Sequence, residues 1–377
     1  MNMSLLKKFF SFFSNLDFIT LAIIIALAGY GTLMVYSATS GSIGYMDRKI
    51  VQVLLGLGVI FIVANIKYSI VQSFALPFLA FTCLLLVLTL IFGITSKGAT
   101  RWLNIGIRFQ PSELAKLAVP VYLSCFLGQQ EGPMNWRRLI ISSLAVAIPS
   151  GLVILQPDLG TTILVALSGL VVIFLAGLSW RIIIVGIIAL IVIAPIFWEY
   201  GMHDYQKVRV LTILNPDADP LGAGYHVNQS KIAIGSGGIT GKGILQGTQV
   251  QLNFLPEAHT DFIFSVLSEE LGLVGVTVLF SLFFFLILRM FWLATIATNK
   301  VAQLLCASQG FILSIYVVVN VGMVSGLLPV VGVPLPFVSY GGTSFVSLCV
   351  TFGLVMGFYN QTQREKNSFK QSVTNKY

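Results

Sequence analysis

Charged side chains are scarce in this chain. Lys, Arg, Asp and Glu make up 10% of its 377 residues, whereas 56% of the residues are hydrophobic. An ordinary soluble domain is about 25% charged, so the composition excludes a soluble fold. Acidic residues number only 14 against 22 basic ones, which gives a net charge of +8. Because basic residues beside apolar segments orient membrane proteins, we assign this excess to a membrane and not to nucleic acid.

Cysteine and histidine are also rare. The four cysteines lie inside apolar runs without CxxC spacing, which excludes a disulfide framework and indicates small core residues. The three histidines, His203, His226 and His259, are spaced too irregularly for a zinc site. No cleavable signal peptide is expected, because the first apolar segment is too long for one.

Long apolar runs fill most of the chain. A helix needs roughly 20 apolar residues to cross about 30 Å of hydrocarbon. We therefore predict an all-α, polytopic membrane protein with about ten transmembrane helices in one integral membrane domain over residues 1–377. The expected spans are 17–37, 50–66, 71–94, 112–128, 138–155, 160–178, 182–199, 262–289, 301–323 and 343–359.

The distribution of Lys and Arg predicts the orientation. Ten spans place both termini on one side, and a cytoplasmic assignment gives twelve basic residues in inner segments against five in short outer loops. Residues 360–377 then form a cytoplasmic tail. The outer side holds loops 97–111, 156–158 and 324–342, and a long segment, 200–261, between the seventh and eighth spans. Loops on a rigid scaffold usually carry function, so we expect the chemistry at the extracytoplasmic face.

Ionisable residues at membrane depth are costly and tend to be functional, and one cluster follows the outer loop 97–111. Pro111 suits the first turn of a helix, and Glu113 and Lys116 lie three residues apart on one face, near enough to pair. Two interpretations stay open. The pair neutralises itself and fixes helix packing, or it lines a cavity in which Lys116 binds an anionic ligand.

A second cluster runs from Glu257 to Glu270 and contains His259 and Asp261. Asp261 begins the eighth span, so one interpretation is an N-cap residue, a role that Thr260 could fill instead. The other is a carboxylate at the membrane boundary that acts as a general base. His259 is either a contact to the substrate or a divalent ion, or a polar loop residue.

A glycine-rich stretch covers residues 234–243. It is not a Walker A loop, because Ser236 and Gly243 occupy the places of a Gly and a Ser or Thr. Two interpretations stay open: a backbone nest for a pyrophosphate with Lys242 nearby, or a flexible turn. In the outer loop 97–111, Arg101 and its neighbour Trp102 are typical of an interfacial anchor.

Five blocks of the sequence, in order, resemble the SEDS family (shape, elongation, division and sporulation proteins). The blocks are Arg101–Trp102 with Gln110–Lys116, Gln156–Thr161, His259–Phe264, Glu269–Gly272 and Asn320–Gly342. With the elongation-specific members of the family, the likeness extends to Asp219–His226 and Gly241–Gly243.

The resemblance implies a peptidoglycan glycosyltransferase that polymerises lipid II at the outer face of the bacterial cytoplasmic membrane, for cell elongation and rod shape. It also implies a class B penicillin-binding transpeptidase and the elongation machinery as partners. Because membrane helices meet through small residues, we expect the eighth and ninth spans to dock this partner. The small residues expected there are Gly272, Gly275, Ser281, Ala307 and Ser308.

In the mechanism that we expect, Asp261 deprotonates the 4-hydroxyl of an acceptor N-acetylglucosamine, and this oxygen attacks the anomeric carbon of the lipid-linked donor with inversion. Lys116, Arg101 and Lys242 are candidates to stabilise the departing pyrophosphate. A divalent cation, Mg²⁺ or Mn²⁺, is a further candidate, with no ligands assigned. The alternative function is a lipid II flippase, and a third is a pure scaffold. The gathering of carboxylates and glycine-rich loops at the outer face favours the enzyme.

Overall fold

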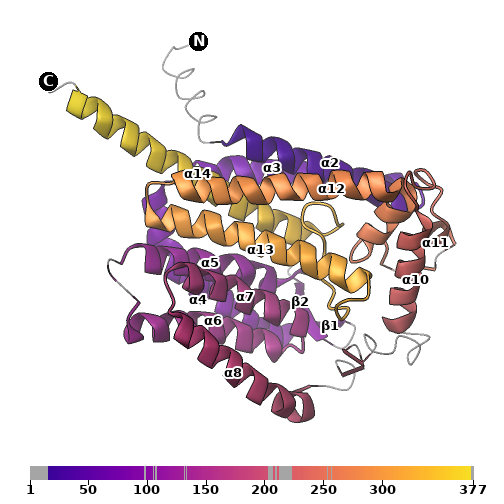
Figure 1. The fold of residues 1–377 in the computed structure, drawn as a ribbon, viewed down its shortest axis with the longest axis horizontal. Coiled ribbons are helices and arrows are strands. Elements are labelled where there is room, and N and C mark those ends of the chain that lie inside the picture. The colour runs from indigo at the N-terminus through magenta and orange to yellow at the C-terminus, as the bar shows by residue number, and fades with distance from the viewer. Residues whose placement is uncertain are drawn as a thin grey trace.

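The computed structural model describes residues 16–374, apart from 97, 98, 105, 107, 131, 133, 203–206, 209, 212–222, 253 and 256. Within these residues the long helices lie alongside one another as a bundle (Figure 1). Each predicted span coincides with one helix. These helices are α2 (Phe18–Ala38), α3 (Ile43–Ala64), α4 (Tyr68–Phe92), α5 (Pro111–Gly128), α6 (Trp136–Ile154), α7 (Leu159–Leu175), α8 (Trp180–Ile196), α12 (Ile263–Ile296), α13 (Lys300–Val324) and α14 (Gly342–Thr374).

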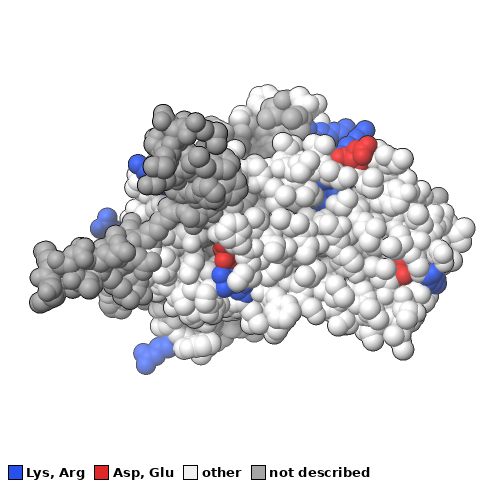
Figure 2. All heavy atoms as spheres, turned by 90° about the horizontal axis from the view of Figure 1, so that it is seen from above, with Lys and Arg blue, Asp and Glu red and all other residues white. Residues whose placement is uncertain are grey.

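The helical, polytopic fold is confirmed. Seven of the described helices are long and apolar enough to cross a membrane, and α7 is a shorter apolar helix. Helices α3 and α5 carry more polar residues and are not among the seven, so the number of crossings stays a prediction. Figure 2 shows why the fold suits a bilayer: on this face, the charged side chains form a few small groups among uncharged ones.

The two ends of the bundle differ. At one end lie the first turn of α2 and the last turns of α14 (Figure 1). At the other end lie the elements of the predicted outer loops. These are the antiparallel strands β1 (Ile94–Ser96), β2 (Ala99–Asn104) and β3 (Arg108–Phe109), and the helices α10 (Ala223–Ser236) and α11 (Thr248–Gln251). A π-helical turn, η1 (Phe197–Gly201), follows α8. The loops predicted to carry function therefore share one end.

Several helices extend beyond the predicted spans. Helix α3 begins at Ile43, well before the predicted residue 50, so Arg48 and Lys49 lie in the helix and not in an outer loop. At the other end of the chain, α14 continues through the predicted tail as far as Thr374. Its residue Gln361 accepts a hydrogen bond from the backbone N–H of Tyr68 (2.8 Å), so the beginning of this tail packs on the bundle.

Glycines bring α3 and α14 into close contact. A Cβ on Gly56 would lie 2.4 Å from the ring of Phe345, and a Cβ on Gly357 would lie 2.7 Å from the carbonyl oxygen of Ala64. Small residues let membrane helices approach closely, where packing forces are strongest. This contact fixes α3 against α14, the helix that follows the Pro- and Gly-rich loop of residues 324–342.

The glycine-rich stretch packs against a kink in α12. The kink is at Gly272, whose φ of +60° is readily adopted by glycine alone. Opposite it, the backbone N–H groups of Lys242 and Gly243 donate to the carbonyls of Glu269 (3.0 Å) and Glu270 (2.9 Å). These two donors are used inside the protein and are not available to a pyrophosphate, and the nest interpretation of the segment stays a prediction.

Candidate active site

The Pro- and Gly-rich loop before α14 is tied to the segment before α12. The hydroxyl of Ser339 donates to the carbonyl oxygen of Thr260 (2.6 Å) and accepts a bond from the N–H of Leu335 (2.8 Å). The N–H of Tyr340 donates to the carbonyl oxygen of His259 (2.9 Å). Two blocks far apart in the sequence thus form one structural unit.

Asp261 lies next to this unit. The side-chain amide of Asn320, on α13, donates to the carbonyl oxygens of Asp261 (3.1 Å) and Val333 (2.7 Å). A Cβ on Gly332 would lie 3.3 Å from the Asp261 carboxylate, so glycine leaves room above that oxygen. The backbone of Asp261 is therefore held between α13 and the loop, with its carboxylate beside the loop.

The interpretation of Asp261 as a helix cap was wrong. The N-cap of α12 is Phe262, and no side chain makes a capping hydrogen bond there. The alternative cap, Thr260, instead donates to the backbone and side chain of Glu257 (3.1 and 3.0 Å). Asp261 is thus not the N-cap residue of α12, and its general-base role stays a prediction.

The predicted pairing of Glu113 with Lys116 is confirmed. Pro111 occupies the first turn of α5, as expected. The Nζ atom of Lys116 lies 2.6 Å from a carboxylate oxygen of Glu113, and both side chains are less than 10% exposed. The ammonium also lies 5.2 Å from the centre of the Tyr316 ring, which adds a cation–π contact. The pair is buried and largely self-neutralised.

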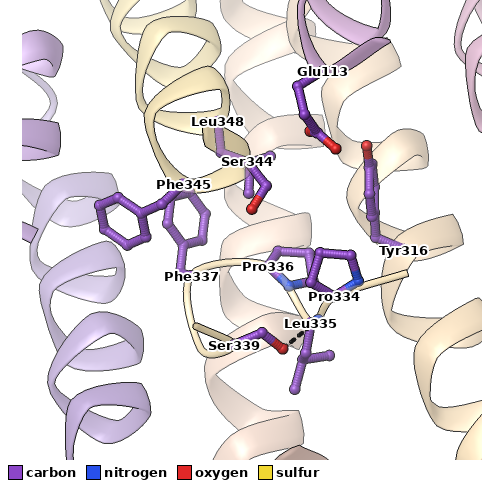
Figure 3. A pocket seen from close by; sticks show the side chains of 10 residues that line it. All are labelled: Glu113, Tyr316, Pro334, Leu335, Pro336, Phe337, Ser339, Ser344, Phe345 and Leu348. Atoms are coloured by element: carbon purple, nitrogen blue, oxygen red, sulfur yellow. Dashed lines mark hydrogen bonds between the residues drawn. The ribbon is translucent and has the colours of Figure 1, made fainter. Parts of the chain in front are cut away.

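A small cavity of about 10 Å³, the room of about one water molecule, separates this pair from the Pro- and Gly-rich loop. Glu113 and Tyr316 point toward one another on one side, and Pro334 and Pro336 close the other (Figure 3). Ser339, which binds the segment before Asp261, also lines it. The structure therefore places the two predicted clusters on opposite sides of one loop.

The other two predicted cations have carboxylate partners. In β2, the Nε atom of Arg101 lies 3.0 Å from a carboxylate oxygen of Asp158, the residue that caps α7. The Nζ atom of Lys242 lies 2.7 Å from the fully buried carboxylate of Glu269. Neither of these partners was predicted from the sequence. A role for either cation in binding pyrophosphate stays a prediction.

His259 lies in an aromatic cluster. Its ring centre is 5.3 Å from that of Tyr45 and 5.7 Å from that of Tyr340, both in edge-to-face contacts. Burial lowers the pKa of His259, and the nearby carboxylate of Glu257 opposes this shift only in part. The ring therefore favours the neutral form and packs among aromatic side chains.

No group of three or more His, Cys, Asp or Glu side chains is placed to hold a metal ion in the part of the chain that the structure describes. These residues do not fit a dedicated metal centre. We therefore derive no catalytic step through a metal.

Most of the small residues expected to form a docking surface on the eighth and ninth spans are not accessible to a partner. Gly272, Gly275 and Ser308 are buried in the chain's own packing. A Cβ on Gly272 would lie 2.4 Å from the backbone of Gly241. These small residues serve contacts within the chain.

Sequence reasoning also missed three residues of the site: Tyr316, Ser339 and Lys49. Lys49 is completely buried, and its ammonium binds the carbonyl oxygens of Phe337 (3.3 Å) and Ser339 (2.7 Å). A lysine at the start of an apolar run usually marks a membrane interface, so no local signal pointed to this position.

Comparison with known families agrees with this geometry. The family model of the FtsW, RodA and SpoVE cell cycle proteins matches residues 17–364. The chain therefore belongs to this family, the SEDS proteins, and the resemblance read from its five blocks is confirmed.

Within the family, the chain is 50% identical to the peptidoglycan glycosyltransferase MrdB of Escherichia coli K12 over 355 residues, which are 94% of this chain and 96% of that protein. It is 38% identical to the probable peptidoglycan glycosyltransferase FtsW of Geobacter sulfurreducens, over 90% of this chain and 94% of that protein.

Two solved structures share the fold. One chain of a peptidoglycan synthase complex matches with a TM-score of 0.80 and 32% identity, over 92% of this chain and 98% of that one. The rod shape determining protein RodA of Thermus thermophilus matches with a TM-score of 0.70 and 29% identity, over 92% and 97%. The chain is thus a multi-pass protein of the bacterial inner membrane.

Proposed function

We infer that this chain is a peptidoglycan glycosyltransferase. The observation that carries the inference is its 50% identity to MrdB over nearly the full length of both proteins. The geometry supports it, because the carboxylate of Asp261 and the Glu113–Lys116 pair adjoin the same loop. Both lie at the end of the bundle that carries the outer loops.

The substrate that we propose is lipid II, a disaccharide-pentapeptide linked to undecaprenyl pyrophosphate. Asp261 takes the proton from the 4-hydroxyl of the acceptor sugar, and the freed electron pair forms a bond to the anomeric carbon of the donor. The bond from that carbon to the diphosphate oxygen breaks, and the diphosphate departs with the bonding electrons. Attack from the opposite face inverts the anomeric centre, so one base and a stabilised leaving group suffice.

Positive charge favours the departure of the diphosphate. Lys116 is the first candidate, because its ion pair borders the cavity beside the loop. Lys242 is more accessible, with 27% of its side chain exposed. The ion pair with Glu269 holds its ammonium group in place. Arg101 is held by Asp158 at the same end of the bundle.

A divalent cation, Mg²⁺ or Mn²⁺, enters the proposal only together with the substrate. Magnesium commonly binds through one or two carboxylates and the phosphates of a ligand, so a preformed protein site is unnecessary. Polymerisation should then fall when a chelator is added and recover when the metal is restored. Unchanged synthesis after chelation would remove the metal from the proposal.

The distribution of Lys and Arg supports an orientation. We propose that both termini face the cytoplasm and that the end carrying β1–β3, α10 and α11 faces outward, where the polymer is needed. The outer face also suits a class B penicillin-binding transpeptidase as partner, because new glycan strands require cross-linking. The likeness to a chain of a peptidoglycan synthase complex supports such a partner.

The decisive experiment incubates the purified protein with labelled lipid II and resolves the products by size. A glycosyltransferase gives a ladder of glycan strands. A lipid II flippase gives no ladder but moves labelled lipid II across the bilayer of a vesicle, and a scaffold does neither. A purified, folded protein that makes no glycan, alone or with its transpeptidase, would refute the proposed function.

A further inference from the structure

Lys49 is a buried cation with an unusual set of partners. Its side chain, on the second turn of α3, is fully inaccessible. Its ammonium donates to the carbonyl oxygens of Ser339 (2.7 Å) and Phe337 (3.3 Å) and lies 5.0 Å from the centre of the Phe345 ring. Among the ion pairs of the described residues, none includes Lys49.

Such an arrangement is costly. A buried charge without a counter-ion loses several kcal/mol of solvation, which carbonyl dipoles and an aromatic ring offset only in part. An apolar side chain would fill the same space without this penalty. Ionisable residues kept at membrane depth are therefore functional by default, and the partner of the charge indicates the function.

The partner here is a strained turn. Phe337 has a φ of +63°, in the left-handed region that a bulky side chain rarely adopts. Such a conformation persists only where the surroundings hold it firmly, and these sites cluster at functional centres. This turn comprises residues 337–340. Lys49 holds it by two hydrogen bonds, to the carbonyls of Phe337 and Ser339.

This turn also holds the segment before Asp261. Ser339 donates from its hydroxyl to the carbonyl of Thr260, and Tyr340 donates from its N–H to the carbonyl of His259. A second contact from α3 reaches the same place. Tyr45, one helical turn before Lys49, packs edge-to-face against the rings of both His259 and Tyr340.

We propose that Lys49 is a positioning residue for the glycosyl transfer. Its ammonium fixes the turn of residues 337–340, and this turn fixes the backbone that presents the Asp261 carboxylate to the acceptor hydroxyl. The proposal rests on the proposed glycosyltransferase function. It assigns Lys49 no contact with the substrate, so its loss acts on the rate of the chemical step and not on substrate binding.

The test compares Lys49→Met with wild type in the lipid II assay. Met keeps an apolar stem but donates no hydrogen bond, so the turn loses both bonds. A misplacement of about 1 Å can cost ~10²-fold in rate, and we expect kcat to fall by that order while KM stays within a few-fold. The matched control is Arg289→Met, which removes another largely buried cation, ion-paired with Asp17, at the other end of the bundle. This control should lose stability but keep kcat.

Hydrogen exchange distinguishes positioning from a general loss of stability. In Lys49→Met, the amides of Leu335 and Tyr340 should lose protection, because each of these hydrogen bonds has one partner within the released turn. In Arg289→Met they should keep it. Lys49→Met with kcat within threefold of wild type, or with unchanged exchange at these amides, would overturn the proposal. So would an equal loss of kcat in the control.

Ser339→Ala provides the second variant if Lys49→Met does not fold. It removes the hydroxyl that links the turn to Thr260 and should lower kcat without a comparable change in KM. Where both single variants fold, the double variant should lose little more than either one, because the two residues act through one connection. Full activity in Ser339→Ala, or additive losses, would contradict the proposal. An inactive wild type would refute the glycosyltransferase function instead, and the exchange measurement would still test the contacts.

Discussion

The Glu113–Lys116 pair offers a test that separates structure from catalysis. Its atoms are 2.6 Å apart and its side chains are almost fully buried, so either single variant leaves an uncompensated charge. Breaking a buried pair in this way costs about 3–5 kcal/mol. Typical proteins have a total stability of about 5–15 kcal/mol, so Lys116→Met and Glu113→Gln should each unfold much more readily than wild type.

The double variant, Glu113→Gln with Lys116→Met, removes both charges and should recover most of this stability. If Lys116 also stabilises the departing diphosphate, the rate of glycan synthesis by the folded double variant should still be lower by ~10²-fold or more. Unfolding in a detergent titration gives the stability, and the glycan ladder gives the activity. A stable double variant with wild-type activity would show that the pair only fixes helix packing. The pair of Arg289 and Asp17, replaced by Met and Asn, is the control for loss of a buried pair away from the site.

Three further predictions follow from the fold. Gly241→Ala should destabilise the protein by about 2 kcal/mol or more, since its Cβ would lie 2.1 Å from a carbonyl of α12. Gly238 also has a positive φ but faces open space, so Gly238→Ala should lower the stability less in the same unfolding titration. Because the pKa of His259 is lowered by burial, the folded state binds a proton less readily than the unfolded state, so stability should fall as the pH drops below about 6.5. His259→Phe should weaken that dependence, and an identical pH profile would contradict it. A phosphatase fused after Gly243 should be active and one fused after Lys67 inactive; the reverse pattern would overturn the orientation.

The sequence predicted features that depend on nearby residues. The apolar runs located the helices, because a bilayer demands about 20 apolar residues for each crossing. The pairing of Glu113 with Lys116 followed from their spacing on one helix face. The start of α3 was missed because the charged run Asp47, Arg48 and Lys49 was assigned to a loop.

Features that depend on distant residues escaped prediction. The carbonyl partners of Lys49, on Phe337 and Ser339, are 288 and 290 residues away along the chain. Nothing in its local sequence distinguishes Lys49 from an interfacial lysine. The glycine-rich stretch suggested a phosphate site because the kink that it packs against, at Gly272, was not visible in the sequence. A single sequence shows which residues are unusual, but their partners require the folded chain.

The most direct test of the central claim is glycan synthesis by Asp261→Asn. The structure removes helix capping as a role for this residue, and Asn keeps its size while accepting no proton. We expect a folded, membrane-inserted variant that makes ~10²–10⁴-fold less glycan from lipid II than wild type. The control is Asp47→Asn, which changes an exposed aspartate near the start of α3 and should keep full activity. Synthesis by purified Asp261→Asn within a few-fold of wild type would contradict the role of Asp261 as the base.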